Sequence, residues 1–292
     1  MNELDIRCLV NPGMTLGEGP SWDAASCRLY WVDIYENRIY RHDPAAGRTE
    51  SWTTPEHVGF VLVGANGSLF AGFKSGLHDV TLEVDGTVTA SRIDRIDDDR
   101  DDVRFNDATR DREGRIWACT VGGSPERPLG AFYCYDTKLN RRTVDDSYVV
   151  GNGPALSPDG RLLYTVESTG HPGRPKGVYV SRVTASGELE EQRLLIGWDG
   201  RASSPDGVVT DDHGNLWLGE WAGNVLRSFS AAGEQTAAIP LPAWNVTKAA
   251  FGGVRGDLLY VTSARYGVDA ETLARYPDTG GVLEIAGIGS AG

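Results

Sequence analysis

The sequence contains little cysteine, few basic residues and no long apolar run, and each shortage excludes a class of protein. The cysteines form no Cys-x-x-Cys pair and the first residues carry neither a basic region nor an apolar run. We therefore expect a cytoplasmic protein with free thiols at Cys8, Cys27, Cys119 and Cys134. With 28 Lys and Arg against 41 Asp and Glu, the formal charge of -13 opposes binding to nucleic acid or to an anionic membrane. No apolar stretch approaches the roughly 18 residues that span a bilayer, so we expect a soluble protein.

Several common catalytic motifs are also absent. The five histidines show no His-Glu-x-x-His or His/Cys ligand spacing, which argues against a zinc protease. There is no Gly-x-Ser-x-Gly, no phosphate-binding Walker loop and no Asp-x-Asp-x-Asp-Gly calcium loop. Long stretches of helical apolar periodicity are missing, whereas Gly (37) and Trp (8) are abundant. Turns and aromatic strands therefore dominate, which indicates an all-β fold.

A turn residue followed by an apolar and then an aromatic residue recurs six times along the chain. The aromatic positions, here called the anchors, are Tyr30, Phe70, Trp117, Tyr164, Trp217 and Tyr260. Most anchors are followed by a second aromatic or β-branched run, then by a turn and a polar strand. Repeats of roughly 40 to 50 residues are typical of propeller blades. We predict that residues 1–292 form a single six-bladed β-propeller domain, with four-stranded antiparallel blades around a central tunnel.

Two segments stand outside this repeat. Residues 6–10 form an apolar run before the first anchor, and we expect them to close the ring by pairing with the final blade. Residues 93–102 carry alternating charges between the second and third anchors. We interpret this acidic run as a solvated loop, and the alternative is a lid over one face of the ring.

Residues at the same distance before each anchor should face one another, because the first strand of each blade lines the tunnel. Eleven or twelve residues before the anchors stand Glu18, Gly59, Asn106, Asn152, Asp206 and Lys248, or Ala249 by the alternative count. Four of these six positions carry a carboxylate or a carboxamide. Two carboxylates and one or two amide oxygens that converge repel one another unless a cation lies between them. The pattern predicts one divalent cation, although Asn and Asp before Gly or Pro also occur simply as turn residues.

The tetrapeptide Ser-Pro-Asp-Gly occurs twice, at 157–160 and at 204–207, and provides an internal control. Asp159 comes directly before Gly160, in the turn that precedes an anchor. Asp206 stands eight residues before the equivalent Gly214 and shares the position of the other candidate ligands. We therefore predict that Asp159 is structural and that Asp206 is a metal ligand.

Taken in order, these local sequences resemble the family of gluconolactonases, regucalcin (senescence marker protein) and luciferin-regenerating enzyme, over essentially the whole chain. The resemblance depends on Leu-Gly-Glu-Gly-Pro-Ser-Trp at 16–22, Arg-Phe-Asn-Asp at 104–107, Asn-Gly at 152–153, Pro-Asp-Gly at 205–207 and Ala-Phe-Gly-Gly at 250–253. Residues 241–248 and 276–282 are most similar to bacterial pentonolactonases of the xylonolactonase type. The resemblance implies a metal-dependent lactonase that opens an aldonolactone to the aldonic acid.

Carried over residue by residue, the resemblance implies a role for each matched position. Glu18, Asn152 and Asp206 correspond to the metal ligands. Arg104 and Asn106 correspond to contacts with substrate hydroxyls or the ring carbonyl, and Glu126 matches a further acidic substrate contact. Asp206 is also our expected general base, because a ligand carboxylate can reach a metal-bound water.

Several properties stay open at this stage. Ca²⁺, Zn²⁺, Fe²⁺, Mn²⁺ and Mg²⁺ all suit oxygen ligands of this kind, and xylono-, arabinono- and gluconolactone are all candidate substrates. We expect a monomer whose partner is a small-molecule sugar lactone. The alternatives are another metal-dependent propeller hydrolase that cleaves phosphoesters, and a non-enzymatic calcium-binding regulatory propeller, since a fold does not fix a function.

Overall fold

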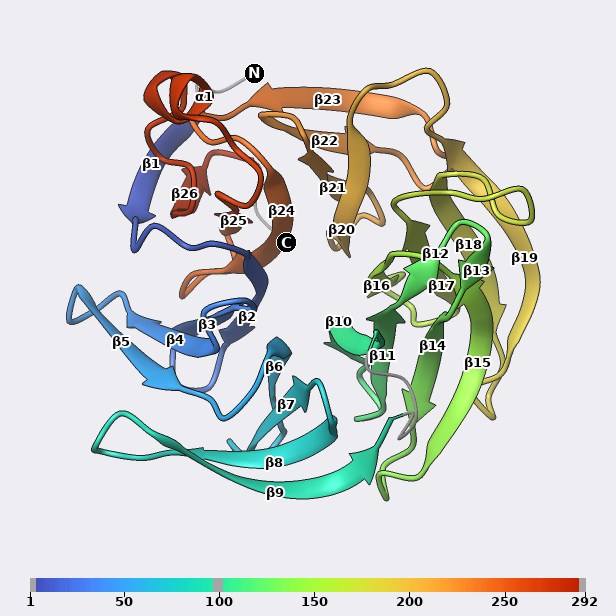
Figure 1. The fold of residues 1–292 in the computed structure, drawn as a ribbon, viewed down its shortest axis with the longest axis horizontal. Helices are drawn as coiled ribbons and strands as arrows, with labels where there is room; N and C mark the ends of the chain where they lie inside the picture. The colour runs from blue at the N-terminus through green and yellow to red at the C-terminus, as the bar shows by residue number, and fades with distance from the viewer. Residues whose placement is uncertain (1–3, 97–101, 289–292) are drawn as a thin grey trace.

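The computed structural model describes residues 4–96 and 102–288, which are almost entirely β-strands (Figure 1). Within these residues, six four-stranded antiparallel sheets stand around a central axis. This arrangement confirms the predicted all-β, six-bladed propeller. None of the described helices is long and apolar enough to span a membrane.

Each blade runs from an innermost strand at the axis to an outermost strand at the rim. The first three blades are β2 (Gly17–Asp23), β3 (Arg28–Asp33), β4 (Arg38–Asp43), β5 (Arg48–Thr53); β6 (Val58–Val63), β7 (Leu69–Phe73), β8 (Gly76–Leu82), β9 (Val88–Arg95); and β10 (Arg104–Arg110), β11 (Ile116–Val121), β14 (Gly130–Tyr135), β15 (Arg141–Tyr148). The fourth and fifth are β16 (Gly151–Leu156), β17 (Leu162–Glu167), β18 (Gly177–Val183), β19 (Leu189–Gly197); and β20 (Ser204–Thr210), β21 (Leu216–Trp221), β22 (Val225–Phe229), β23 (Gln235–Pro240). The sixth is β24 (Val246–Gly252), β25 (Leu258–Ser263), β26 (Val282–Ala286) and β1 (Asp5–Val10).

Two short elements interrupt this pattern. A hairpin of β12 (Gly123–Ser124) and β13 (Arg127–Pro128) is inserted after β11, and the helix α1 (Ala270–Arg275) lies between β25 and β26. The acidic run at 93–102 begins at the end of β9, but residues 97–101 lie outside the described residues. The loop and lid interpretations of that run are therefore not distinguished.

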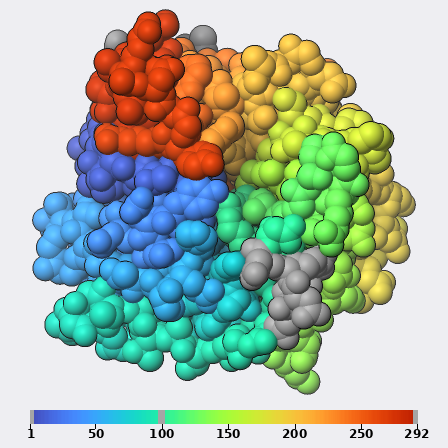
Figure 2. Space-filling model, in the orientation of Figure 1, coloured from blue at the N-terminus to red at the C-terminus, as the bar shows by residue number. Residues whose placement is uncertain are grey.

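The ring is closed by the two ends of the chain. Strand β1 pairs antiparallel with β26, so that Ile6 lies opposite Ile285. The same strands carry an ion pair between Arg7 Nη2 and Glu284 Oε1 at 2.6 Å. In the space-filling view the N-terminal segment packs directly against the C-terminal segment (Figure 2). The predicted closure by residues 6–10 is confirmed.

The apolar core lies between neighbouring blades. One cluster joins Phe60 and Leu62 of the second blade to Phe105, Ile116 and other residues of the third. Similar clusters join the first blade to the second, the fourth to the fifth and the fifth to the sixth. Because apolar burial between blades stabilises the ring, the axis itself is free to carry polar side chains.

The four cysteines are all free, as expected. Cys119 and Cys134 are buried, and Cys8 and Cys27 are partly buried. All four lie in the described part of the chain. The fold is therefore held by blade packing and ring closure, without a disulfide among them.

Candidate active site

The residues predicted to share a position do so in the structure. Each is the second or third residue of the innermost strand of its blade: Glu18 in β2, Gly59 in β6, Asn106 in β10, Asn152 in β16, Asp206 in β20 and Lys248 in β24. The six innermost strands, one from each blade, surround the central axis (Figure 1). Counting back from the aromatic anchors therefore located the right strand and the right end of it.

A β-bulge lies at this position in every innermost strand. In β2, for example, the register shifts between Glu18 and Ser21. A bulge adds a residue to one strand and redirects its side chain. The glycines after Glu18 and Asn152 have φ values of +56° (Gly19) and +74° (Gly153), which strongly favour glycine. This explains the glycine that follows Glu18 and the glycine that follows Asn152.

Five of the six predicted site residues line one cavity of about 370 Å³, here called the site cavity: Glu18, Arg104, Asn106, Asn152 and Asp206. Its polar wall is completed by Ser168, Thr169 and Ser204. The structure thus brings together side chains from four blades. Their roles as ligands and substrate contacts stay predictions.

A chain of hydrogen bonds fixes the amide side chains of the site cavity. Arg104 Nη1 donates to Asn106 Oδ1 at 2.8 Å, and Asn106 Nδ2 donates to Asn152 Oδ1 at 2.7 Å. Asn152 Nδ2 in turn donates to Ser168 Oγ at 3.0 Å. The amide nitrogen of Asn152 is therefore committed to Ser168, and its oxygen keeps a second lone pair for a cation.

The two carboxylates of the site cavity are buried and incompletely paired. Glu18 is 3% exposed and Asp206 is 4% exposed. Glu18 Oε2 accepts a hydrogen bond from the Gly19 amide at 3.0 Å, whereas Asp206 Oδ1 has no partner among the described residues. Burial, with the nearby Asp107 carboxylate, raises the pKa of Glu18 to about 8. Burial and the Glu18 and Asp107 carboxylates hold the pKa of Asp206 well above its usual range.

These properties fit a divalent cation. Buried like charges with an unpaired oxygen are costly unless a positive charge lies between them. In residues 4–96 and 102–288, no three side chains of His, Cys, Asp or Glu form a metal-binding group. An ion held by Glu18 and Asp206 would therefore use the Asn152 oxygen as its third protein ligand, and an all-oxygen donor set suits a hard or borderline ion.

A buried ion pair close to this cavity was not foreseen. Lys248 Nζ donates to Asp107 Oδ1 at 2.6 Å, and Asp107 Oδ2 has no partner in the described structure. Lys248 shares the position of the candidate ligands but does not line the site cavity. The distance of Lys248 from its anchor Tyr260 could have indicated that it lies in the tunnel. The sequence does not show which carboxylate it pairs with.

The site cavity also has an aromatic wall, which the sequence analysis missed. Tyr35, Trp221 and Tyr266 line the site cavity. The ring centroids of Tyr35 and Tyr266 are 5.1 Å apart, and those of Trp221 and Tyr266 are 6.5 Å apart. The Arg104 guanidinium lies 5.7 Å from the Tyr35 ring centre. These aromatic residues come from three blade ends, so no local pattern connects them in sequence.

The sequence analysis also made predictions for Glu126 and Asp159, and the structure shows where both residues lie. Glu126 is exposed on the β12–β13 hairpin, where it accepts a hydrogen bond from Ser124 Oγ at 2.8 Å. It is not among the described residues that line the site cavity, so the structure does not bring it to the candidate ligands and its role stays a prediction. Asp159 accepts hydrogen bonds from Ser157 Oγ and the Arg161 amide in an exposed turn, which confirms its structural role.

Glu167 and Ser168 support the site from the end of β17. Glu167 is fully buried and its carboxylate accepts hydrogen bonds from the amides of Val149, Val150, Thr169 and Gly170. These contacts join the segment just before Asn152 to the segment just after β17. Ser168 then orients the Asn152 amide by accepting its hydrogen bond, so this pair fixes the orientation of a candidate ligand.

Comparison with known proteins gives a consistent set of relatives. The family model described as the SMP-30/Gluconolactonase/LRE-like region matches residues 16–265. A 6-deoxy-6-sulfogluconolactonase of Pseudomonas putida is 30% identical over 284 residues, covering 97% of this chain and 94% of the relative. Regucalcin of Oryctolagus cuniculus is 27% identical over 298 residues, covering 100% and 97%. The crystal structure of the calcium-binding protein regucalcin from Agrobacterium tumefaciens has a TM-score of 0.89 at 24% identity, covering 99% and 95%, and shares the fold.

Proposed function

Because the chain belongs to the SMP-30/gluconolactonase/LRE-like family, we propose that it is a sugar lactonase that hydrolyses an aldonolactone with the help of one divalent cation. The observation that carries this proposal is the site cavity itself. It holds two buried carboxylates, one with an oxygen that has no hydrogen-bond partner among the described residues, together with a polar wall and an aromatic wall. The name of the lactonase relative supports the reaction class.

Glu18, Asp206 and the amide oxygen of Asn152 would hold the cation. When bound, a divalent ion would polarise the lactone carbonyl and make water a stronger acid. Asp206 would accept the proton of the attacking water, because its Oδ1 atom has no hydrogen-bond partner in the described structure. Ser168 and Asn106 keep the Asn152 amide in the orientation that presents its oxygen.

The two walls of the site cavity suit a cyclic polyol. Tyr35, Trp221 and Tyr266 would pack against the apolar face of the sugar ring, and the polar wall would bind its hydroxyls. Arg104 is held by Asn106 and by the Tyr35 ring, and it would donate to a substrate hydroxyl or to the ring carbonyl. A cavity of about 370 Å³ lies within the usual size range of small-molecule sites and accommodates a pentono- or hexonolactone.

The direct test is hydrolysis by purified protein that has been freed of metal with a chelator. Xylono-, arabinono- and gluconolactone would be offered without metal and with Ca²⁺, Zn²⁺, Fe²⁺, Mn²⁺ or Mg²⁺ in turn. We expect hydrolysis above the spontaneous rate only when a divalent ion is added. An aryl phosphoester serves as the comparison substrate. Hydrolysis of that ester alone, or ion binding without any hydrolysis, would contradict the proposal.

A further inference from the structure

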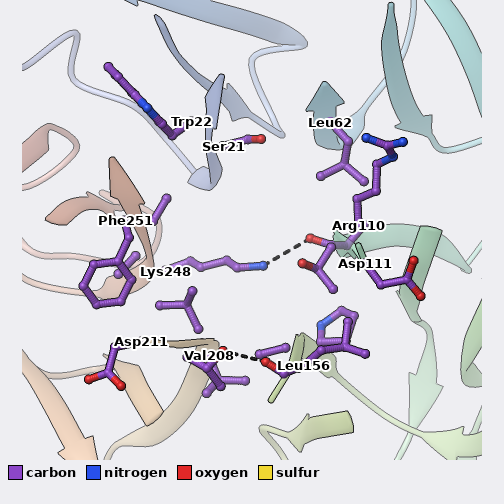
Figure 3. Close-up of a pocket in the computed structure, with 18 of the residues that line it drawn as sticks. Ser21, Trp22, Leu62, Arg110, Asp111, Leu156, Val208, Asp211, Lys248 and Phe251 are labelled. Carbon is purple, nitrogen blue, oxygen red and sulfur yellow. Dashed lines mark hydrogen bonds between the residues drawn. The ribbon is translucent and has the colours of Figure 1, made fainter. Parts of the chain in front are cut away.

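The Lys248 side chain crosses the tunnel between two cavities. The site cavity is lined by the first residues of the innermost strands, and a second cavity of about 430 Å³ is lined by their last residues, among them Trp22, Leu62, Arg110 and Phe251. Since the innermost strands all run the same way along the axis, the two cavities lie at opposite ends of the tunnel. Lys248 lines the second one, and Figure 3 shows its side chain extending across that cavity towards the strand of Arg110.

The contact at the end of this side chain joins opposite blades. Lys248 belongs to β24 in the sixth blade, and Asp107 belongs to β10 in the third. Lys248 Nζ donates to Asp107 Oδ1 at 2.6 Å and to the Ala108 carbonyl at 3.3 Å. The two side chains are 7% and 0% exposed. Solvent therefore screens this ion pair very little.

A glycine next to a candidate ligand makes room for the lysine. A Cβ atom placed on Gly207 would lie 2.6 Å from both Cβ and Cγ of Lys248. Gly207 follows Asp206 in β20, so the lysine packs against the residue next to a candidate metal ligand. In the Asp-Gly sequence at 206–207, Asp206 thus provides a candidate ligand and Gly207 leaves space for the lysine side chain.

Three buried carboxylates share this region with one buried ammonium. Glu18, Asp107 and Asp206 are all at most 4% exposed, and Lys248 is 5% exposed. Asp107 directly follows Asn106, which lines the site cavity and donates to Asn152. Arg104, the other cation near Glu18, is only partly buried at the cavity wall, so water weakens its influence. With all three carboxyl groups ionised, as they would be with a cation bound, three negative charges and one positive charge leave a net charge of minus two, which matches one divalent ion.

We propose that Lys248 is a positioning residue that acts as the internal counter-cation of the metal centre, pairing with Asp107 so that the centre keeps the charge of a divalent-ion site. This inference rests on the proposed metal site formed by Glu18, Asn152 and Asp206. A purely structural ion pair would stabilise the ring in the same way but would not set the charge that the cation meets. If Lys248 is a counter-cation, its loss should strengthen ion binding. If its role is structural only, its loss should weaken ion binding.

The experiment titrates Ca²⁺, and then Mn²⁺, into the full-length protein by calorimetry. Lys248→Met leaves a net charge of minus three, so ion affinity should rise by roughly tenfold or more. Asp107→Asn leaves minus one, so affinity should fall by roughly tenfold or more. The double variant restores minus two and should bind close to the unmodified protein. Lys138→Met, at an exposed turn, is the control for loss of a distant lysine and should change nothing.

A second measurement reports charge selectivity. Tb³⁺ luminescence should show that Lys248→Met gains more affinity for the trivalent ion than for Ca²⁺, because a larger cation charge responds more strongly to the lost ammonium. If Lys248→Met does not fold, Asp107→Asn and the double variant still decide the matter, since only charge compensation predicts that the second substitution restores binding.

Two outcomes overturn the inference, and a third overturns the proposed metal site. Weaker ion binding in both single variants would assign the pair a structural role only. A double variant that binds the ion more weakly than Asp107→Asn would also assign the pair a structural role only. Failure of the unmodified protein to bind any divalent ion would instead overturn the proposed metal site, and this outcome is distinguishable because it appears before any substitution is made.

Discussion

Asp159 and Asp206 occur in the same tetrapeptide but have opposite surroundings. The Asp159 side chain is 59% exposed and accepts hydrogen bonds within its own turn. Asp206 is 4% exposed, and one of its oxygens lacks a partner in the described residues. The identical local sequence therefore does not decide the role of either carboxylate, and the position within the blade does.

Asp206→Ala should abolish divalent-ion binding and lactone hydrolysis together, because it removes one of the two carboxylates proposed to hold the ion. Asp159→Ala should keep both properties, since it changes only an exposed turn. Calorimetric ion titration and a lactone assay of the two variants provide the comparison. Equal losses in both would mean that the tetrapeptide itself matters and that the position in the innermost strand does not.

Arg104→Ala should weaken catalysis while leaving the ion in place, because the Arg104 guanidinium donates to Asn106, which is not one of the proposed metal ligands. A charge-assisted hydrogen bond is worth about 1.5–3 kcal/mol, so kcat/KM on a polyhydroxylated lactone should fall about 10- to 150-fold. A lactone without hydroxyls should lose less if Arg104 binds the polyol, and equally if it binds the carbonyl. Loss of ion binding, or unchanged hydrolysis, would refute this role.

The raised pKa of Glu18 predicts how pH affects the metal-free protein. The pKa is about 8 in the folded state against an ordinary value of 4.5, so between these values the folded protein holds a proton that the unfolded chain has released. The free energy of unfolding should therefore fall as pH rises through this window. A divalent ion displaces the proton, so its stabilising effect should grow from pH 5 to pH 8. Melting temperatures with and without Ca²⁺ test this, and an ion effect that shrinks towards pH 8 would contradict it.

At the scale of elements, the innermost strand is the unit that repeats. Each copy has a bulge near its start, but only some copies carry a polar side chain there. Gly59 occupies this position in β6 because the neighbouring strand β10 lies against it. A Cβ atom on Gly59 would lie 2.3 Å from the Phe105 carbonyl oxygen. At this position the second blade thus contributes close packing and no candidate ligand.

Gly59→Ala should lower the free energy of unfolding by about 1–3 kcal/mol, because the added methyl group forces β6 and β10 apart. The matched control is Gly197→Ala in β19, an outermost strand, where the nearest atom would be 3.8 Å away. Its effect should lie within about 1 kcal/mol of zero. Urea denaturation of both variants measures the difference. If the two variants lose similar free energies of unfolding, the innermost strands can separate to accommodate the added methyl group.

At the scale of the whole molecule, stability depends on closing the ring. Strand β1 covers the edge of β26 and contributes Ile6 and Cys8 to the apolar contacts of the sixth blade. An uncovered strand edge presents free backbone groups that pair with other chains. The pairing of β1 with β26 joins residues that are far apart in sequence, so the ring is complete only when both ends of the chain are in place.

Removal of residues 1–10 should lower the melting temperature and cause concentration-dependent aggregation, because the edge of β26 becomes exposed. Arg7→Ala is the control, since it keeps the strand and removes only the ion pair with Glu284. The Arg7 side chain is 62% exposed, so this change should cost less than about 1 kcal/mol. Light scattering and thermal unfolding follow both proteins. A truncated chain that stays monomeric and equally stable would show that closure is dispensable.

The sequence by itself determined the number of blades, the position of the innermost strands and the closing segment. Turn residues, alternating strands and aromatic anchors such as Trp117 act locally, because they depend on the conformation and burial of a few neighbouring residues. Counting from the anchors then placed Glu18, Asn152 and Asp206 at equivalent points of the ring. The family resemblance assigned their roles, which a single sequence does not supply on physical grounds alone.

The tertiary structure alone decided which side chains meet across the tunnel. Lys248 and Asp107 are separated by 141 positions in the chain, and nothing near either residue specifies the other. The aromatic wall of Tyr35, Trp221 and Tyr266 likewise comes from separate blade ends. Only ring closure brings such residues together, because the direction of each side chain depends on the bulge and twist of its own strand and on the packing of both neighbouring blades.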